Sequence, residues 1–160
     1  MTRTFKENLY KGLYQEIEIK KMIINKRSKF QKIEIFDTFT YGRVLALDGI
    51  VQITEKDESA YSEMLVHPAM QSLSKNAKHI LIVGGGDGAV AEEVLKYNYI
   101  KNIDLVDIDK EVVELSKKYF KKINNYSLIN KKLNIFYEDA FNFIDHSKSL
   151  YDLVIADRPD

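Results

Sequence analysis

Cysteine is absent from the 160-residue sequence, which excludes disulfide bonds and metal sites built on thiolates. Acidic and basic residues are equal in number, 24 of each, so no excess charge points to nucleic acid or to an anionic membrane. No apolar run approaches membrane-spanning length, and the first residues lack the apolar core of a signal peptide. The three histidines stand far apart, which does not suit a metal site. We therefore expect a cytoplasmic protein without a metal, a nucleic-acid partner or a membrane partner.

Apolar residues in the first third of the chain alternate with polar ones. Residues 14–54 show this period of two, with polar residues 25–28 as a predicted turn and Asp48-Gly49 as a two-residue hairpin turn. The pattern predicts an antiparallel β domain over residues 1–56. Residues 57–73 have helical spacing, although Pro68 should kink this helix or end its regular part. A polar linker then closes a connecting segment over residues 57–78.

The remainder, residues 79–160, alternates short apolar strands with amphipathic helices. We predict strands over residues 80–83, 103–107, 133–137 and 152–156, and helices over 87–97, 109–122 and from 140 onward. Strands separated by helices imply a parallel sheet with right-handed crossovers. The expected fold class is therefore α/β, with a Rossmann-like sheet preceded by a small antiparallel domain.

The glycine-rich stretch after the first predicted strand resembles the start of a nucleotide-binding βαβ unit. Glycines let the chain turn and let a ligand approach the backbone. Gly84, Gly86 and Ala89 also fit a dinucleotide fingerprint, so the pattern alone leaves that alternative open. Asp87 lies where a dinucleotide would place its pyrophosphate, and a carboxylate there repels phosphate and attracts a cation. We favour a nucleoside that carries a positive charge, such as a sulfonium.

Each of the four predicted strands is followed by a carboxylate, and ligands of such sheets bind at these strand ends. The residues are Asp87, Asp107, Asp139 and Asp157, with Asp160 close behind. Asp107 suits ribose hydroxyls, and Asp139 suits an adenine amino group unless it only caps a helix. The first and fourth strands are neighbours in a doubly wound sheet, so the carboxylates of Asp87 and Asp157 should converge on one pocket.

Several carboxylates in one pocket suit an alkylamine, which is protonated at neutral pH. The amine must lose a proton before it attacks carbon, and a nearby carboxylate can accept that proton. A sulfonium is already an activated leaving group. The residues therefore suggest transfer of an alkyl group from a sulfonium to an amine.

These residues, with several motifs in order along the chain, resemble the N-terminal half of the polyamine aminopropyltransferase (spermidine synthase) family. The motifs are Ser28–Gln31, Tyr41–Gly49, Thr54–Glu58 with Tyr61 and Glu63-Met64, Gly84–Gly88, Val106–Asp109, Glu138–Phe141 and Tyr151–Asp160. The resemblance implies a sheet of the S-adenosylmethionine-methyltransferase type. It also implies an N-terminal β domain that supports a homodimer or homotetramer.

The resemblance further implies substrates and residue roles. The donor would be decarboxylated S-adenosylmethionine, a co-substrate and not a tightly bound cofactor, and the acceptor a diamine such as putrescine. The products would be spermidine and methylthioadenosine. The implied nucleoside-binding residues are Gln31, Gly84, Gly86, Asp107, Asp139 and Ala140, the implied amine-binding residues are Tyr61, Asp87 and Asp160, and Asp157 is the implied proton acceptor.

Four features depart from the family pattern. Asp107 stands where Glu is usual, Ala140 replaces Gly, and Arg158-Pro159 replace small polar residues. The sequence also stops after the fourth strand, where the family continues. We expect this strand to be an apolar edge and a 160-residue fragment alone to be inactive. An S-adenosylmethionine-dependent methyltransferase and a non-catalytic nucleoside- or polyamine-binding module remain the alternative functions.

Overall fold

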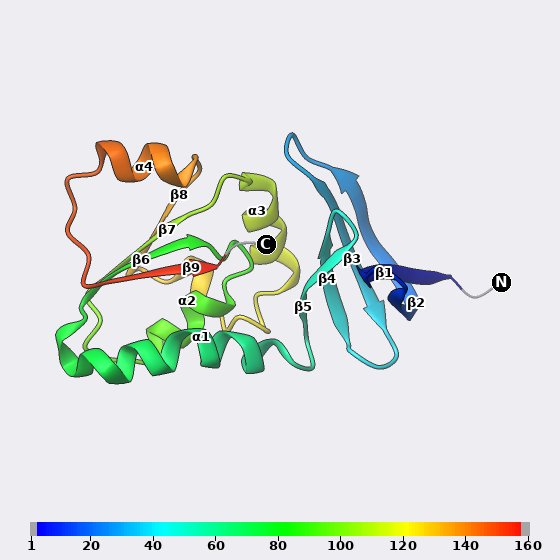
Figure 1. Cartoon of the computed structure of the whole chain (residues 1–160), viewed down its shortest axis with the longest axis horizontal. Helices are drawn as coiled ribbons and strands as arrows, with labels where there is room; N and C mark the ends of the chain where they lie inside the picture. The colour runs from blue at the N-terminus through cyan, green and yellow to red at the C-terminus, as the bar shows by residue number, and fades with distance from the viewer. Residues whose placement is uncertain (1–2, 158–160) are drawn as a thin grey trace. The chain divides into compact units, whose positions relative to one another are not determined.

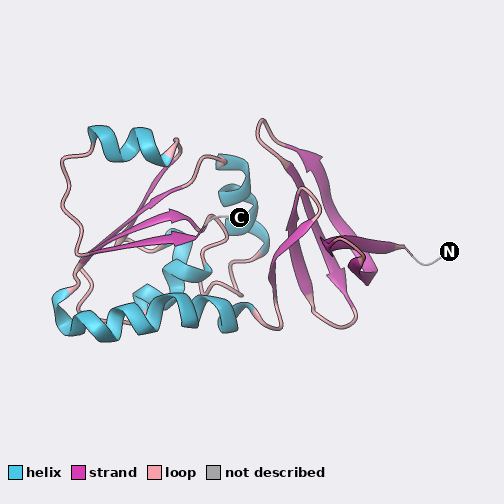
Figure 2. Ribbon diagram, in the orientation of Figure 1, coloured by secondary structure: helices cyan, strands magenta, loops and turns pink. Residues whose placement is uncertain are grey.

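The computed structural model describes residues 3–157, which form two compact units (Figures 1 and 2). The first unit spans Met1–Glu58 and the second Ser59–Asp160. Asp160 and the pair Arg158-Pro159 lie outside the described residues. No helix within residues 3–157 has the length and apolar character needed to cross a membrane.

The N-terminal unit is a five-stranded antiparallel sheet in which each strand pairs with the next along the chain. Its strands are β1 (Thr4–Tyr10), β2 (Leu13–Arg27), β3 (Lys32–Thr38), β4 (Arg43–Leu47) and β5 (Ile50–Thr54). The first part of β2 pairs with β1 and the second part with β3, and two register irregularities interrupt the second part. Such irregularities bend a strand and increase its twist, so the sheet curls.

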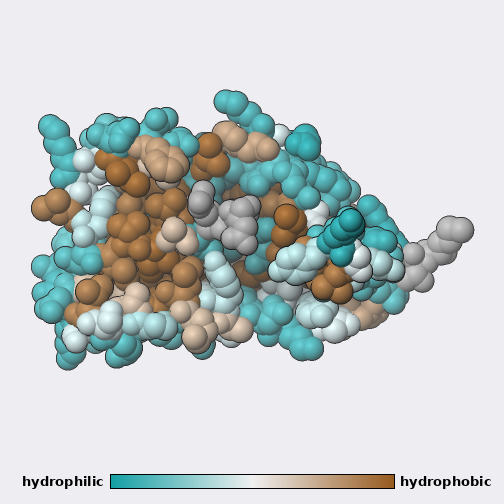
Figure 3. All heavy atoms as spheres, in the orientation of Figure 1, coloured by the Kyte–Doolittle hydropathy of each residue, from teal (hydrophilic) through white to brown (hydrophobic). Residues whose placement is uncertain are grey.

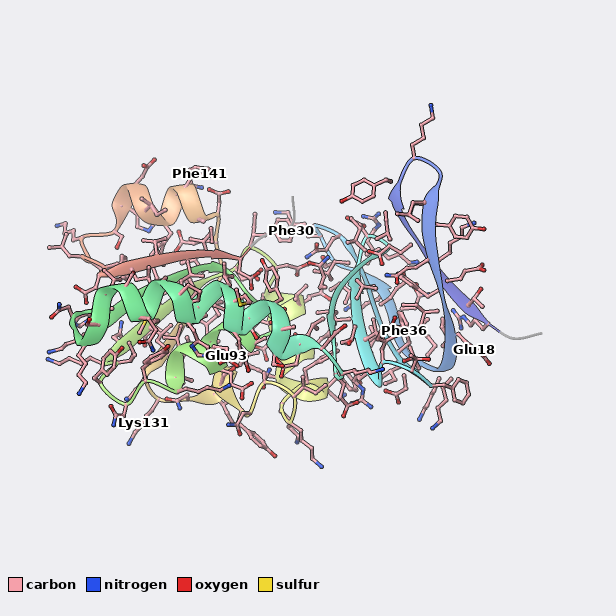
Figure 4. All side chains as sticks on the ribbon, turned by 60° about the horizontal axis from the view of Figure 1, so that its bottom comes forward. Glu18, Phe30, Phe36, Glu93, Lys131 and Phe141 are labelled. Atoms are coloured by element: carbon pink, nitrogen blue, oxygen red, sulfur yellow. The ribbon has the colours of Figure 1, made fainter. Side chains whose placement is uncertain are left out.

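The curl brings the two outer strands of this sheet together. The buried carboxylate of Glu7 on β1 accepts a hydrogen bond from the backbone N–H of Val51 on β5, at 3.1 Å. Phe5 and Phe36 pack inside the unit with ring centroids 5.0 Å apart (Figure 4 labels Phe36). The predicted antiparallel domain is therefore confirmed, with β1 as an additional strand.

One predicted turn is wrong. The structure continues β2 through residues 25–27 and places the turn at residues 28–31. The Ser28 hydroxyl accepts hydrogen bonds from the N–H groups of Phe30 and Gln31, each at 3.1 Å. Residues 25–27 are exposed at the tip of a hairpin, so their polarity reflects solvent contact and not a turn. The Asp48-Gly49 turn is confirmed, and both residues have the positive φ that such a turn requires.

The second unit is a four-stranded parallel sheet with the strand order β8-β7-β6-β9. Its strands are β6 (His79–Gly84), β7 (Asn102–Val106), β8 (Leu133–Phe136) and β9 (Leu153–Asp157), and its helices are α1 (Glu58–Leu73), α2 (Ala89–Leu95), α3 (Lys110–Tyr119) and α4 (Ala140–His146). Short 3-10 segments, η1 (Ser74–Asn76) and η2 (Ser127–Ile129), complete it. The predicted Rossmann-like sheet is confirmed, as is the adjacency of its first and fourth strands.

The two faces of this sheet are covered unequally. On one face, Ile80, Ile82, Ile103 and Leu105 are fully buried in a core that includes residues of α1, α2 and α3. The other face carries a smaller cluster of Leu81, Val106 and Phe143, the last from α4. Val154, the partner of Leu81 in the β6–β9 pair, is 54% exposed on this side, and Figure 3 shows apolar side chains over β9 and β6. Among residues 3–157, β9 pairs only with β6, so it is an apolar edge.

The predicted extent of one helix is confirmed, and the predicted start of another is wrong. Helix α1 spans Glu58–Leu73, close to the predicted 57–73, and does not end at Pro68, because Val66 and Met70 are fully buried in the core on one face while Pro68 lies on the exposed face. Helix α2 begins at Ala89 and not at residue 87, because residues 87 and 88 still belong to the glycine turn that follows β6.

Candidate functional site

The centre of the candidate site is the glycine turn, residues 84–88, between β6 and α2. Gly85 and Gly88 have φ angles of +70° and +89°, which residues other than glycine rarely adopt. The N–H of Gly88 donates to the carbonyl of Gly85 at 2.9 Å and closes the turn. The Asp87 carboxylate accepts from the N–H of Ala89 at 2.8 Å. Asp87 therefore lies at the start of α2, where the helix dipole favours a negative charge.

Asp157 lies on one side of this turn. It ends β9, its Cα pairs with that of Gly84, and its carbonyl accepts from the N–H of Gly85 at 3.1 Å. A Cβ atom at Gly85 would be 3.2 Å from Oδ2 of Asp157, so the carboxylate lies directly against the turn. Burial raises the pKa of Asp157 above its ordinary value, and a hydrogen bond from the Tyr61 side chain opposes this rise.

Asp107 lies on the other side of the turn, at the end of β7. A Cβ atom at Gly86 would clash with its carboxylate, at 3.1 Å from Cγ. The N–H of Asp109 donates to Oδ1 of Asp107 at 2.8 Å. Burial is the largest cause of the raised pKa of Asp107, the negative charges of Asp109 and Asp157 add to it, and the N–H groups of Asp109 and Gly86 oppose it. The carboxylates of Asp107 and Asp157 are therefore close enough across the turn for the charge of Asp157 to raise the pKa of Asp107.

Asp139 occupies the sheet edge beyond Asp107, after β8. Its Oδ1 accepts from the N–H groups of Phe141 and Asn142, at 3.0 and 3.1 Å, so Asp139 is the N-terminal cap of α4. The capping role left open by the sequence is thus present, and one carboxylate oxygen is committed to it. Ala140 is the first residue of α4 and packs against the cluster of Leu81, Val106 and Phe143.

Residues 124–130, which the sequence predicts as a loop, form hydrogen bonds to the glycine turn that sequence reasoning missed. The Asn124 side-chain amide donates to the carbonyl of Asp87, and the Ser127 hydroxyl donates to the carbonyl of Gly88, both at 2.7 Å. Asn124 and Ser127 are buried. A hydrogen bond across 37 residues leaves no periodic pattern, so only the concentration of Asn and Ser in a predicted loop could have drawn attention to it.

Two predicted site residues do not belong to the described part of the second unit. Gln31 belongs to the N-terminal unit, where its backbone closes the turn between β2 and β3. Asp160 lies outside the described residues. The structure of the second unit thus brings together Gly84, Gly86, Asp87, Asp107, Asp157 and Tyr61, with Asp139 and Ala140 farther along the same edge.

The assembled groups give this edge of the sheet a negative character. Carboxylates follow all four strands, and two of them are partly buried with raised pKa values. Within residues 3–157, no three side chains of His, Asp or Glu are grouped in a way that could hold a metal ion. The arrangement can bind organic cations and can accept a proton at a carboxylate of increased basicity.

Two family models match adjacent parts of the chain. Residues 58–160 match the spermine/spermidine synthase domain, and residues 4–55 match the spermidine synthase tetramerisation domain. A polyamine aminopropyltransferase from Alkaliphilus metalliredigens is 41% identical over 143 residues, which cover 89% of this chain and 50% of that protein. Another from Buchnera aphidicola is 39% identical over 158 residues, 99% of this chain and 55% of that protein.

Solved structures give the same result. The spermidine synthase from Thermotoga maritima is similar with a TM-score of 0.90 and 33% identity, over 98% of this chain and 56% of that one. A spermidine synthase in complex with the transition-state analogue AdoDATO gives a TM-score of 0.92 and 33% identity, over 100% and 55%. The chain spans about half the length of the curated relatives it matches. Because the synthase-domain model covers more than half of the chain, the chain belongs to the spermine/spermidine synthase family.

Proposed function

We propose that this chain carries the donor-binding and proton-accepting residues of an aminopropyltransferase. The enzyme would transfer the aminopropyl group of decarboxylated S-adenosylmethionine to a diamine such as putrescine. One observation carries the proposal: Asp157 and Asp107 lie against opposite sides of the glycine turn, and burial raises the pKa of both. Membership of the family supports the same reaction.

The proposed ligands are cations, as this site requires. Decarboxylated S-adenosylmethionine carries a sulfonium and an ammonium group but no carboxylate, and a diamine carries two ammonium groups at neutral pH. A partly buried carboxylate attracts such charges more strongly than a solvated one, because less water screens the interaction. Ordinary S-adenosylmethionine carries an additional carboxylate, which Asp87 and Asp157 would repel. This difference favours aminopropyl transfer over methyl transfer.

Proton transfer is assigned to Asp157. The free amine uses its lone pair to attack the aminopropyl carbon attached to sulfur. A C–N bond forms as the C–S bond breaks, and the electron pair of the C–S bond remains on sulfur as the thioether of methylthioadenosine. The nitrogen must give up one proton, and Asp157 accepts it directly or through water. The hydrogen bond from Tyr61 holds this carboxylate in place while burial keeps it basic.

The other residues are assigned to binding. Asp107 accepts hydrogen bonds from the ribose hydroxyls, and Asp139 with Ala140 contacts the adenine. Asp87 binds the ammonium group of the aminopropyl chain or of the amine. Family membership suggests that Tyr61 and Asp160 bind the amine and that Gln31 contacts the nucleoside. The tetramerisation-domain match over residues 4–55 supports a homotetramer assembled through the N-terminal unit, which size-exclusion chromatography with light scattering tests directly.

One incubation tests the function. The chain is supplied with decarboxylated or ordinary S-adenosylmethionine and with putrescine, spermidine, agmatine or cadaverine, and the nucleoside products are separated. Methylthioadenosine that requires both the decarboxylated donor and an amine supports the proposal. S-adenosylhomocysteine would identify a methyltransferase instead, and binding without either product would identify a binding module. The Asp157→Asn variant is the matched control, since it preserves the size of the side chain.

A further inference from the structure

The loop over residues 124–130 donates two side-chain hydrogen bonds to the glycine turn, and the proposed function assigns no role to them. Asn124 and Ser127 have relative exposures of 0% and 1%, and their side chains donate to the carbonyls of Asp87 and Gly88. The carbonyl of Gly88 also accepts from the N–H of Glu92, as the first hydrogen bond of α2. Two consecutive peptide groups of the turn are thus fixed by side chains 37 and 39 residues away.

The packing between loop and turn is close enough to be specific. A Cβ atom at Gly88 would lie 2.7 Å from Leu128 Cγ, 2.7 Å from Ser127 Oγ and 2.9 Å from Asn124 Nδ2. Glycine is therefore required at residue 88 by the protein's own loop. The turn cannot shift toward the loop, and the two donated hydrogen bonds prevent it from shifting away.

Only the donor half of the Asn124 side-chain amide forms a hydrogen bond to another described residue. Its Nδ2 donates to Asp87, whereas its Oδ1 is buried without a hydrogen-bond partner among the described residues. An unpaired buried acceptor is unfavourable, so the donor half of the amide is the part that the fold uses. Aspartate has the same shape but cannot donate when ionised, and it would turn a negative oxygen toward the Asp87 carbonyl.

We infer that Asn124, supported by Ser127, is a positioning residue for Asp87. The amide fixes the carbonyl side of Asp87, while the N–H of Ala89 fixes its carboxylate at 2.8 Å. The inference rests on the proposed function to the extent that Asp87 binds the cationic part of the substrates. Because Asp107 is held by different groups, the N–H groups of Asp109 and Gly86, loss of the Asn124 amide affects cation binding and spares the nucleoside.

The test compares Asn124→Asp with Asn125→Asp. The control makes the same chemical change one residue away, at an exposed position whose φ of +46° aspartate tolerates. Three quantities are measured on the full chain: the KM for putrescine, the dissociation constant of methylthioadenosine, and the amide hydrogen exchange of Ala89. For Asn124→Asp we expect KM to rise about tenfold, since misplacement of a substrate-binding group has effects up to about a hundredfold. We expect methylthioadenosine affinity within about twofold of wild type and faster exchange at Ala89, with no change in the control.

The outcomes separate positioning from general stability and from the proposed function. An unchanged KM for putrescine, or a loss of methylthioadenosine affinity as large as the rise in KM, would overturn the inference. If the wild-type chain shows no transfer, exchange at Ala89 alone decides the inference. Faster exchange in Asn124→Asp than in Asn125→Asp supports positioning, and equal exchange overturns it. If Asn124→Asp does not fold, Ser127→Ala is judged by the same exchange measurement.

Discussion

Addition of one methyl group at Gly86 is the sharpest test of the site geometry. In Gly86→Ala the new Cβ would clash with the carboxylate of Asp107 and lie 3.1 Å from Cγ2 of Val113. Val113 is fully buried in the core and cannot move aside. The carboxylate of Asp107 is only half-buried, so it is the group that must move, although the N–H of Asp109 holds it at 2.8 Å.

The size of the effect follows from what Asp107 loses. Overpacking of this kind costs about 1–3 kcal/mol in the free energy of unfolding. If Asp107 binds the ribose, its displacement also removes hydrogen bonds to a charged group, which contribute about 1.5–3 kcal/mol. Since about 1.4 kcal/mol corresponds to a factor of ten, the dissociation constant of methylthioadenosine should rise roughly ten- to hundredfold.

Calorimetric titration of methylthioadenosine and thermal unfolding measure the two effects separately. Gly12→Ala is the control, because an added Cβ at Gly12 has no atom within 4 Å, whereas Gly12, unlike Gly86, has a positive φ of +83°. It should lower the melting temperature through backbone strain and leave nucleoside binding unchanged. If Gly86→Ala bound methylthioadenosine as tightly as wild type, Asp107 would not be the ribose-binding group.

Three further predictions concern charged groups. Because burial raises the pKa of Asp157, its ionised form opposes folding, and native stability falls as pH rises through the folded pKa. Asp157→Asn should therefore melt at a higher temperature than wild type at pH 8 but not at pH 3, while turnover falls about 10²- to 10⁴-fold; equal melting curves at both pH values would contradict this. Tyr61→Phe removes the hydrogen bond that lowers the pKa of Asp157, so the acidic limb of the pH–rate profile should move to higher pH, and an unmoved limb would count against that contact. Lys96→Met leaves the buried carboxylate of Glu93 without its 2.6 Å ion pair (Figure 4 labels Glu93), which should cost about 1–3 kcal/mol by chemical denaturation, whereas Lys101→Met at an exposed position should cost little.

The main elements were predictable from sequence because their physical causes are local. A period of two marks strands with one buried face, and a glycine turn between an apolar strand and a helix marks a βαβ unit. The position of Asp107 and Asp157 at one edge of the sheet also followed from sequence, since parallel strands end at the same edge. In these cases the chain direction alone brings the residues together. The convergence of the Asp87 and Asp157 carboxylates on one pocket stays a prediction.

The missed features have causes that are distant in sequence. The β2–β3 turn was misplaced because residues 25–27 are polar through solvent exposure, and polarity alone does not separate a strand tip from a turn. The sequence predicted the extent of helix α1 but left open whether Pro68 ends it; the helix continues because burial of Val66 and Met70 compensates for the backbone hydrogen bond lost at proline. The bonds from Asn124 and Ser127 to the glycine turn depend on tertiary packing, which no local pattern records.

The sequence suggests that the glycines of the turn let a ligand approach the backbone, whereas in the structure Gly85, Gly86 and Gly88 are in close contact with side chains of the protein. A Cβ atom at Gly85 would meet Asp157, one at Gly86 would meet Asp107, and one at Gly88 would meet the loop of Asn124 and Ser127. Each of these glycines therefore makes room for a side chain of the protein itself, and two of those side chains are carboxylates. A dinucleotide site needs similar glycines so that its backbone can approach a pyrophosphate, which two flanking carboxylates would repel. The glycine spacing is compatible with both ligands, and the charge of the neighbours that the glycines admit is what favours a cation.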